Sequence, residues 1–313
     1  MTLAASALAA APAYDPAKPA TWHLSAKLPR QSEARKALLA EWASRPAEPG
    51  EKVLTVEEGE ALLDDPRAEL IYGEKTVSII APSMLVRQRQ EHLDLLKLFL
   101  EPDALATGVA FFRDHENVLE RAAQKHRVDP TVVVSILMWE SKLGVETGSY
   151  VAFNSFASQA FFADEADAVA LKQKGESKRI DPEKQAERVQ TIRVRARKNL
   201  KALVRVCKAR GMDPLAVKGS WAGALGYPQF MPASLRWAED GDGDGKIDLY
   251  TFDDSIASIA RYLGDHGFEK SPEHAVWSYN HESAYVSGVM AWAKALQERL
   301  EAPDAGVALD AGR

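Results

Sequence analysis

The spacing of apolar residues along the chain is mostly helical. Apolar side chains recur every three or four positions in "QSEARKALLAEWA", "VEEGEALLDD" and "MLVRQRQEHLDLLKLFL", which predicts amphipathic helices between about residues 30 and 100. In the first of these, the expected buried face consists of Ala34, Leu38, Leu39 and Trp42. Between the second and third helices, "AELIYGEKTVSIIAP" has β-type residues around Gly73, which indicates a short hairpin or an extended crossing.

From about residue 105 the pattern is almost wholly helical. "TGVAFFRDHENVLERAAQKHRV" predicts one amphipathic helix or two in series. The next helix, "DPTVVVSILMWESKLG", has Asp129 as a favourable N-cap, Pro130 at the first helical position and Gly144 as its stop. The polar segment "DEADAVALKQKGESKRIDPEKQ" predicts a loop or mobile connection, and a long helix follows from Asp181-Pro182 to Gly211.

Composition and charge restrict the class of protein. The chain has 313 residues, enough for one or two domains, and a formal charge of −6, which argues against a general polyanion binder. Its one cysteine, Cys207, excludes an intrachain disulfide and is expected in the core. No apolar stretch is long enough to span a membrane.

The first residues, "MTLAASALAAAPAYD", form an Ala-rich apolar run that ends in an A-x-A-like pattern at residues 11–13. A positively charged start is missing from this run. It is either a signal peptide whose beginning has been lost or an Ala-rich leader, and the first interpretation implies an exported, periplasmic protein. We expect residues 1–20 to be disordered or removed.

Residues 172–210 are strongly basic. This stretch is either a solvated helix face or a contact surface for an anionic polymer such as one of the cell wall. It lacks the interleaved aromatic residues that single-stranded nucleic acid prefers, so we expect no nucleic-acid partner.

The segment "DGDGDGKIDLYT" has the spacing of an EF-hand loop. The side chains of Asp240, Asp242, Asp244 and Asp248 fall at the ligand positions 1, 3, 5 and 9. Lys246 is at position 7, where the backbone carbonyl is the ligand. Such hard oxygen ligands suit calcium. Position 12 departs from the usual pattern because Thr251 replaces a bidentate Glu, although Asp253 and Asp254 follow closely. The alternative is a solvated Asp/Gly turn before a helix.

Glu140 ends the apolar run "ILMWESKLG", where the pattern favours another apolar residue. On a helix it shares a face with Val133, Ile136 and Leu137, so its carboxylate is expected to be partly desolvated. Desolvation raises a carboxyl pKa, as a general acid for a glycosidic oxygen requires. The alternative is a Glu that reaches solvent at the last turn.

A second segment, "GSWAGALGYPQFMPAS", combines small residues with polar and aromatic ones. Tyr227, Gln229 and Phe230 offer stacking rings and an amide, and Ser220 adds a hydroxyl, which is typical of sugar-binding chemistry. The alternative is a tightly packed helix–loop–helix corner. Further on, "YNHESAY" brings Tyr279 and Asn280 near the end of the fold.

Along the chain, "WESKLG" and "TGSY" come first, followed by "GSWAGALGYPQFMPAS", the calcium loop and "YNHESAY". This is the order seen in soluble lytic murein transglycosylases of the B type. The sequence resembles this family, glycoside hydrolase family 103, well over 106–295 and weakly over 30–105. The resemblance implies a mainly α, lysozyme-like transglycosylase fold with a single EF-hand-like loop. The expected regions are a helical extension at 21–105, a catalytic domain at 106–300 with its calcium loop at 240–254, and a tail at 301–313.

The resemblance also implies roles for residues. Glu140 would be the sole general acid/base, Ser220 and Gln229 would line the sugar site together with Tyr279 and Asn280, and Asp254 would complete the shell of a structural calcium ion. The expected reaction on peptidoglycan glycan strands is non-hydrolytic cleavage of the β-1,4 MurNAc–GlcNAc bond to 1,6-anhydroMurNAc ends.

Two departures concern substrate length and specificity: a short link at 268–278 and a basic insertion near 165–185. Two alternatives also remain open. One is a hydrolytic muramidase of the same fold, which needs a second carboxylate or the substrate's acetamido group. The other is a calcium-clipped peptidoglycan-binding protein without turnover.

Overall fold

The computed structural model describes residues 20–45, 51–72, 84–174 and 182–302. The expected leader, most of the expected tail, and the part of the expected hairpin after Tyr72 lie outside these residues. The chain forms two compact units. Unit 1 comprises Met1–Met84, Gly148–Leu225 and Phe230–Arg236, and unit 2 comprises Leu85–Thr147, Gly226–Gln229 and Trp237–Arg313.

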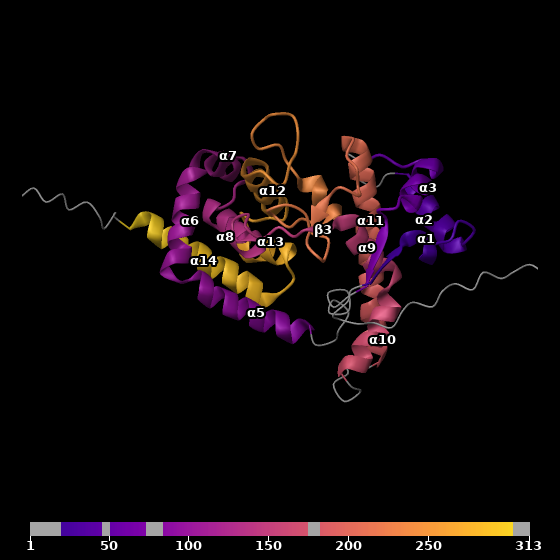
Figure 1. Ribbon diagram of the computed structural model, residues 1–313. Coiled ribbons are helices and arrows are strands. Elements are labelled where there is room, and N and C mark those ends of the chain that lie inside the picture. The colour runs from indigo at the N-terminus through magenta and orange to yellow at the C-terminus, as the bar shows by residue number, and fades with distance from the viewer. Residues whose placement is uncertain (1–19, 46–50, 73–83, 175–181, 303–313) are drawn as a thin grey trace, which may run out of the picture. The chain divides into compact units, whose positions relative to one another are not determined.

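Unit 1 is built mainly of helices with two short antiparallel ribbons (Figure 1). Its long helix α11 packs along α9, and α2 and α10 also contact α11. The elements within this unit are β1 (Ala20–His23), α1 (Leu24–Lys27), α2 (Glu33–Ala43), α3 (Val56–Asp64), β2 (Glu69–Tyr72), β3 (Tyr150–Val151), α9 (Ala152–Phe161), α10 (Ala163–Lys174), α11 (Pro182–Arg210) and β4 (Lys218–Gly219). A 3₁₀ turn, η2, spans Pro232–Trp237 just before the acidic loop.

The helices expected before residue 65 are confirmed, with one correction on α2. Leu38, Leu39 and Trp42 are buried, but Ala34 is exposed and Arg35 is fully buried in its place. The Arg35 guanidinium donates to the Leu28 carbonyl at 3.1 Å and forms ion pairs with carboxylates of α3. A buried charge needs such partners, and the partners come from a different helix, so the periodicity of α2 alone does not show them.

The extended segment expected around 69–72 is confirmed, but its partner is not the residues after Gly73. β2 pairs antiparallel with β1, with Ala20 opposite Tyr72 and His23 opposite Glu69. The pairing is non-local, and hydrophobic spacing within one segment contains no information about a partner some fifty residues away. Residue 20, expected to end the leader, is the first residue of this ribbon.

Residues 164–174 were expected to belong to a loop or mobile connection, and this expectation is wrong, because they lie in helix α10. The helix contacts α9 and α11, and Ala163 and Ala166 are buried. Small alanines allow close packing without the large apolar residues that mark an amphipathic pattern. The long helix α11 is confirmed from Pro182 to Arg210, followed by Gly211 at φ +66°. Cys207 is buried, as expected.

Unit 2 surrounds an apolar helix, α8, with other helices (Figure 1). α8 contacts α6, α7, α12 and α14, and its residues 131–139 are all buried. The helices of this unit are α5 (Met84–Phe99), α6 (Pro102–Asp114), α7 (Glu116–His126), α8 (Pro130–Ser141), α12 (Phe252–Asp265), α13 (Pro272–Tyr279) and α14 (Ser283–Glu301). The expected helix over 107–128 is two in series, since α6 ends and α7 begins at His115.

Helix α8 begins where its sequence predicts, but it ends before the expected stop at Gly144. The Asp129 side chain accepts from the Thr131 N–H at 2.8 Å, and Pro130 is the first helical residue. The helix stops at Ser141, three residues before Gly144. Lys142, Leu143 and Gly144 all have positive φ, at 50°, 54° and 88°. Two non-glycine residues in this region store backbone strain of roughly 1–3 kcal/mol each directly after Glu140.

Candidate active site

The carboxyl of Glu140 lies one residue before the end of α8 and is mostly shielded from solvent. Desolvation raises its pKa from 4.5 to about 7, although a hydrogen bond from Tyr285 acts in the opposite direction. The Tyr285 hydroxyl donates to Glu140 Oε1 at 2.7 Å. A carboxyl that titrates near neutrality can both give and take a proton at working pH.

Tyr285 was not among the expected site residues, yet it makes the hydrogen bond to Glu140. It belongs to the first turn of α14 and is 2% exposed. Its ring meets that of Trp139 edge to face, with centroids 5.8 Å apart. Its place in "YNHESAY", six residues after Tyr279, was the available signal, but a tyrosine in an apolar helix pattern is typical of a core residue.

Tyr279 ends α13, and its hydroxyl donates to the Pro228 carbonyl at 2.5 Å. Burial raises the pKa of Tyr279 well above its ordinary value, and the nearby Glu140 carboxyl adds to this. Asn280 follows as the C-cap and is half-buried. The structure therefore brings Tyr279 and Tyr285 close to Glu140 within unit 2.

The turn 226–229 positions two of the expected sugar-binding residues. Gln229 has φ +49°, and its side-chain amide donates to the Gly226 carbonyl at 2.7 Å and to the Thr147 carbonyl at 3.4 Å. The Tyr227 ring lies against Phe252, with centroids 4.5 Å apart. A side chain at Gly226 is excluded, because a Cβ there would lie 2.4 Å from Leu249.

Ser220 and Phe230 belong to unit 1. The Ser220 backbone N–H donates to the Ala224 carbonyl at 2.8 Å, and its hydroxyl accepts from the Ala224 N–H at 3.1 Å, which closes a tight turn. A Cβ on Gly223 in this turn would lie 2.3 Å from the Phe156 ring. The Phe230 ring is 2% exposed and packs inside unit 1, so its expected contact with a sugar stays a prediction.

The acidic loop brings three of its expected ligands together. Asp240, Asp242 and Asp244 each place a carboxylate oxygen within 4.8 Å of the others. The pKa of Asp242 is raised: a backbone hydrogen bond from Asp244 opposes the shift, but desolvation and the neighbouring carboxylates outweigh it. Gly245, at the sharp turn, has φ +83°. Mutually repelling hard oxygen donors at this spacing fit a calcium ion.

Asp248 and Asp254 are not part of that three-residue cluster. The Asp254 side chain is 3% exposed, and its two oxygens accept from the backbone N–H groups of Gly241 at 2.8 Å and Asp248 at 2.6 Å. It thus ties the loop to the first turn of α12. Lys246 donates its N–H to Asp244 at 2.7 Å.

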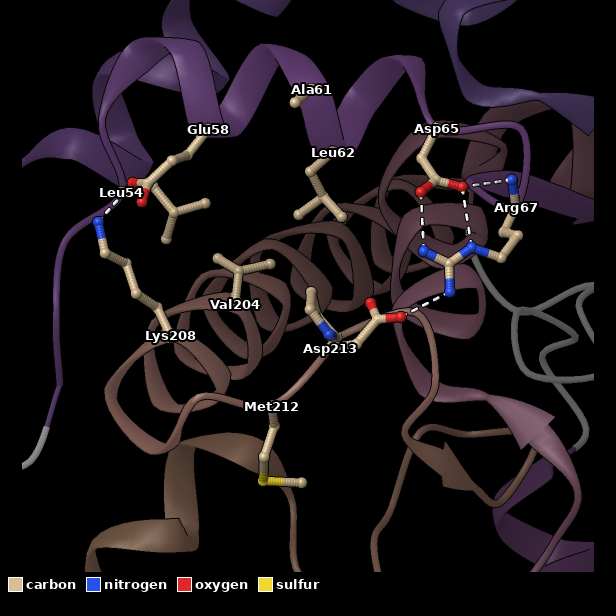
Figure 2. Close-up of a pocket in the computed structure, with 11 residues that line it drawn as sticks. Leu54, Glu58, Ala61, Leu62, Asp65, Arg67, Val204, Lys208, Met212 and Asp213 are labelled. Carbon is tan, nitrogen blue, oxygen red and sulfur yellow. Dashed lines mark hydrogen bonds and ion pairs between the residues drawn. The ribbon is translucent and has the colours of Figure 1, made fainter.

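A pocket in unit 1 lies between α3 and the end of α11 (Figure 2). The charged residues that line it form ion pairs: Lys208 with Glu58, and Arg67 with Asp65 at 2.8 Å and with Asp213 at 2.5 Å. None of the expected site residues lines it. The candidate active site is therefore the Glu140 region of unit 2.

A model of the family described as "Transglycosylase SLT domain" matches residues 70–284. The chain belongs to this family. Over 182 residues it is 32% identical to the membrane-bound lytic murein transglycosylase B of Escherichia coli (strain K12). The aligned residues make up 58% of this chain and 43% of that relative. The chain therefore spans less than half the length of this curated relative.

Solved structures share the transglycosylase SLT fold. The E. coli lytic transglycosylase Slt35 in complex with bulgecin A is 20% identical, with a TM-score of 0.60, over 86% of this chain and 94% of that one. The soluble lytic transglycosylase SltB1 from Pseudomonas aeruginosa is 22% identical, with a TM-score of 0.53, over 68% and 90%. The family match confirms the expected family, and these structural matches confirm a mainly helical, lysozyme-like transglycosylase fold.

In this SLT-family chain, the described part of the basic stretch is involved in internal ion pairs. Arg193 pairs with Asp164 at 2.6 Å and Arg197 with Glu41 at 2.8 Å, while Arg205 is fully buried. The contact with an anionic polymer stays a prediction. Over the described ranges, the structure has no helix that is both long and apolar enough to cross a bilayer.

Proposed function

We propose that the protein is a lytic transglycosylase that cleaves the β-1,4 bond between N-acetylmuramic acid and N-acetylglucosamine in peptidoglycan glycan strands. The observation that supports this most directly is the near-neutral Glu140 carboxyl, hydrogen-bonded to Tyr285. Relatives named lytic transglycosylases, in sequence and in structure, support the same activity.

In this proposal Glu140 acts twice. Protonated, it gives its proton to the glycosidic oxygen as the bond to the anomeric carbon breaks. The resulting carboxylate then takes the proton from the 6-hydroxyl of the same muramoyl residue while that oxygen attacks the anomeric carbon. The products are a free 4-hydroxyl on N-acetylglucosamine and a 1,6-anhydromuramoyl end, and Glu140 is again protonated. A pKa of about 7 suits both roles.

The surroundings of Glu140 favour this route over a hydrolytic muramidase. A retaining hydrolase places its second carboxylate about 5–5.5 Å away and an inverting one about 6.5–9.5 Å away. In the described structure, the pKa of Glu140 is set by desolvation and by the hydrogen bond from Tyr285, and no carboxylate is among these causes. Glu146, the nearest candidate in sequence, is 63% exposed and paired with Lys142 at 2.5 Å.

An attached nucleophile removes the need for a second carboxylate. An intramolecular hydroxyl in good orientation gains an effective molarity of up to about 10⁵–10⁸ M, so it outcompetes water without its own base. Within unit 2, Tyr227, Gln229, Tyr279 and Asn280 are proposed to bind the glycan and hold the muramoyl ring in the required shape. Ser220 of unit 1 stays a proposed sugar-binding residue. The strained φ of Gln229 supports a functional position for this side chain.

We also infer that the loop at 240–254 binds a structural calcium ion. The proposed donors are Asp240, Asp242, Asp244, the Lys246 carbonyl, Asp248 and Asp254. The ion would neutralise the clustered carboxylates and fix the loop against α12. The E. coli Slt35 structure in complex with calcium supports this choice of metal. Because peptidoglycan lies outside the cytoplasmic membrane, the proposed activity requires export, in line with the Ala-rich start of the chain.

The deciding experiment is digestion of purified sacculi, with the muropeptide ends identified by mass spectrometry. We expect anhydromuropeptides, about 18 Da lighter than hydrolytic products because no water is added, that resist borodeuteride reduction. Ends that gain deuterium would instead show a muramidase.

Glu140→Gln should lower the rate by at least about 10²–10⁴-fold, whereas the matched control Glu146→Gln should not. A Glu140→Gln variant that digests sacculi at the wild-type rate would refute the assignment.

A further inference from the structure

A histidine of α5 lies next to the first turn of α14. His92 Nδ1 is 2.7 Å from Glu282 Oε2, and both side chains are largely shielded, with exposed fractions of 19% and 16%. α5 lies beside α14 in unit 2 (Figure 1). The sequence placed no function on either residue. This hydrogen-bonded contact is partly buried, so it restrains the two side chains more than a contact at the open surface does.

Glu282 in turn fixes the position of Tyr285. As the N-cap of α14, it accepts from the Ala284 N–H at 3.0 Å and from the Tyr285 N–H at 2.7 Å. Partial burial by itself would raise the pKa of Glu282, but these backbone bonds and His92 together hold it below its usual range. The carboxylate is therefore ionised and strongly bound at the backbone of the residue that contacts Glu140.

The His92 ring also contacts the Tyr285 side chain. Its centroid is 5.7 Å from the Tyr285 ring and 5.7 Å from the Trp139 ring, and those two rings are 5.8 Å apart. The three rings form a closed triangle. Trp139 precedes Glu140 in the chain, and the Tyr285 hydroxyl at the other end donates to Glu140. His92 thus restrains Tyr285 at its backbone, through Glu282, and at its ring.

We propose that His92, through Glu282, is a positioning residue that keeps the Tyr285 hydroxyl on the Glu140 carboxyl. The role rests on the proposed function of Glu140. His92 does not touch the reacting groups itself. It limits the rotamers of Tyr285, so that the proton-transferring carboxyl keeps one orientation throughout the reaction. An acid/base displaced by about 1 Å can lose about 10²-fold in rate.

The inference has a readout that a purely structural role would not change. The Tyr285 hydrogen bond stabilises the ionised form of Glu140 and acts against desolvation. The titratable groups that face Glu140 are Tyr285 from α14 and Tyr279 from α13. If Tyr285 leaves, the Glu140 pKa rises further. Because the proposed first step needs protonated Glu140, the alkaline limb of the pH–rate profile then moves to higher pH while the maximum rate falls.

The test compares His92→Phe, His92→Gln, Tyr285→Phe and the double variant His92→Phe/Tyr285→Phe, on full-length protein with soluble glycan-strand fragments. His92→Phe keeps a ring but removes the bond to Glu282, and His92→Gln keeps a donor. We expect His92→Phe to lower kcat by about 10-fold or more with KM within about twofold. We also expect it to move the alkaline limb in the same direction as Tyr285→Phe, and His92→Gln to recover part of the loss. Melting temperatures show that each variant is folded.

The double variant separates positioning from an independent effect. If His92 acts through Tyr285, the double variant loses no more activity than Tyr285→Phe alone. Losses that multiply, or a His92→Phe variant with the wild-type rate and limb, would overturn the inference. Glu140→Gln serves as the reference, because an active Glu140→Gln enzyme would refute the proposed function and leave these His92 results as a separate finding.

Discussion

Glu140 must ionise during the reaction in a place that disfavours its charge. Its pKa is about 7 in the folded protein, against 4.5 for an ordinary Glu. The protonated form therefore favours the folded state. This contribution is complete below pH 4.5 and is lost as the pH rises through 7, so ionisation of Glu140 lowers the free energy of unfolding across that window.

Glu140→Gln should therefore stabilise the protein at alkaline pH. The amide keeps the shape and has no charge to desolvate, so the variant should gain up to roughly 3 kcal/mol over wild type at pH 8 and nothing at pH 4. Urea unfolding at both pH values measures this. Glu146→Gln, at an exposed position, should show no comparable gain. Equal stability of Glu140→Gln and wild type at pH 8 would contradict the desolvated carboxyl.

Sequence predicts a residue of the site when its role produces a local pattern, and does not when the role depends on a contact with another helix. Glu140 is visible because a charge interrupts an apolar helix, and Asp129 because N-caps have a local signature. Tyr285 stands in the motif "YNHESAY", but its bond to Glu140 depends on a contact with another helix, as does the contact of His92 with Glu282, and neither contact leaves a local pattern. Arg35 was not among the residues expected to be buried, because the carboxylates that compensate its charge are on α3.

At the scale of elements, the contact between α8 and α14 depends on one small residue. A Cβ on Gly288 would lie 2.3 Å from the Trp139 ring. Gly288 thus allows α14 to come close enough for Tyr285 to reach Glu140. The requirement is steric, because the backbone there is ordinary helix.

Gly288→Ala should cost about 1–3 kcal/mol of stability, as overpacking of a filled core does, and should reduce activity by displacing Trp139. Denaturant unfolding and sacculus digestion measure the two effects. The matched control on the same helix is Lys294→Ala, at a side chain that is 78% exposed, which should change stability by less than about 0.5 kcal/mol. A fully stable Gly288→Ala variant would show that the helices separate easily.

The acidic loop should respond to calcium. Millimolar calcium should raise the melting temperature relative to chelator, because a ligand at 100 times its Kd stabilises a fold by about 2.7 kcal/mol. Asp244→Ala should remove most of that rise, and Asp265→Ala, an exposed acid at the end of α12, should not. A wild-type melting temperature that is the same with calcium and with chelator would refute the calcium proposal.

Helices were predicted well and strand pairing poorly. The periodicity that predicts α2 and α5 is contained within each segment. The partner of β2 is β1, far back in the chain. In the part of α10 whose side chains are described, the buried residues are the small Ala163 and Ala166, so neither element leaves a local pattern.

At the scale of the whole molecule, distant segments are joined by buried charge as well as by apolar contacts. In unit 1 the fully buried Arg205 of α11 donates to the carbonyls of Glu41, Trp42 and Ser44, and pairs with Glu51 at 3.1 Å. Its guanidinium satisfies the carbonyls at the end of α2. A single side chain thus holds the end of one helix against another from a remote part of the sequence.

Arg205→Ala should destabilise the protein by about 3–5 kcal/mol, because it leaves buried acceptors and a carboxylate without a partner. Arg197→Ala is the matched control on the same helix. That arginine pairs with Glu41 but is 37% exposed, so its loss should cost less than about 1 kcal/mol. Thermal or urea unfolding distinguishes the two, and similar losses in both variants would contradict this role for the burial of Arg205.

Two side chains that accept hydrogen bonds from the β2 backbone are synthesised well after β2 itself. The Glu69 N–H donates to Asn154 Oδ1 at 3.1 Å and the Ile71 N–H to Ser158 Oγ at 2.6 Å, across 85 and 87 residues of chain. A ribosome must therefore synthesise much of unit 2 before the first part of unit 1 has its partners. Loop closure over such distances slows folding. A nascent chain that stops before Asn154 therefore lacks these two acceptor side chains, and the β2 backbone gains its bonds to them only after that point.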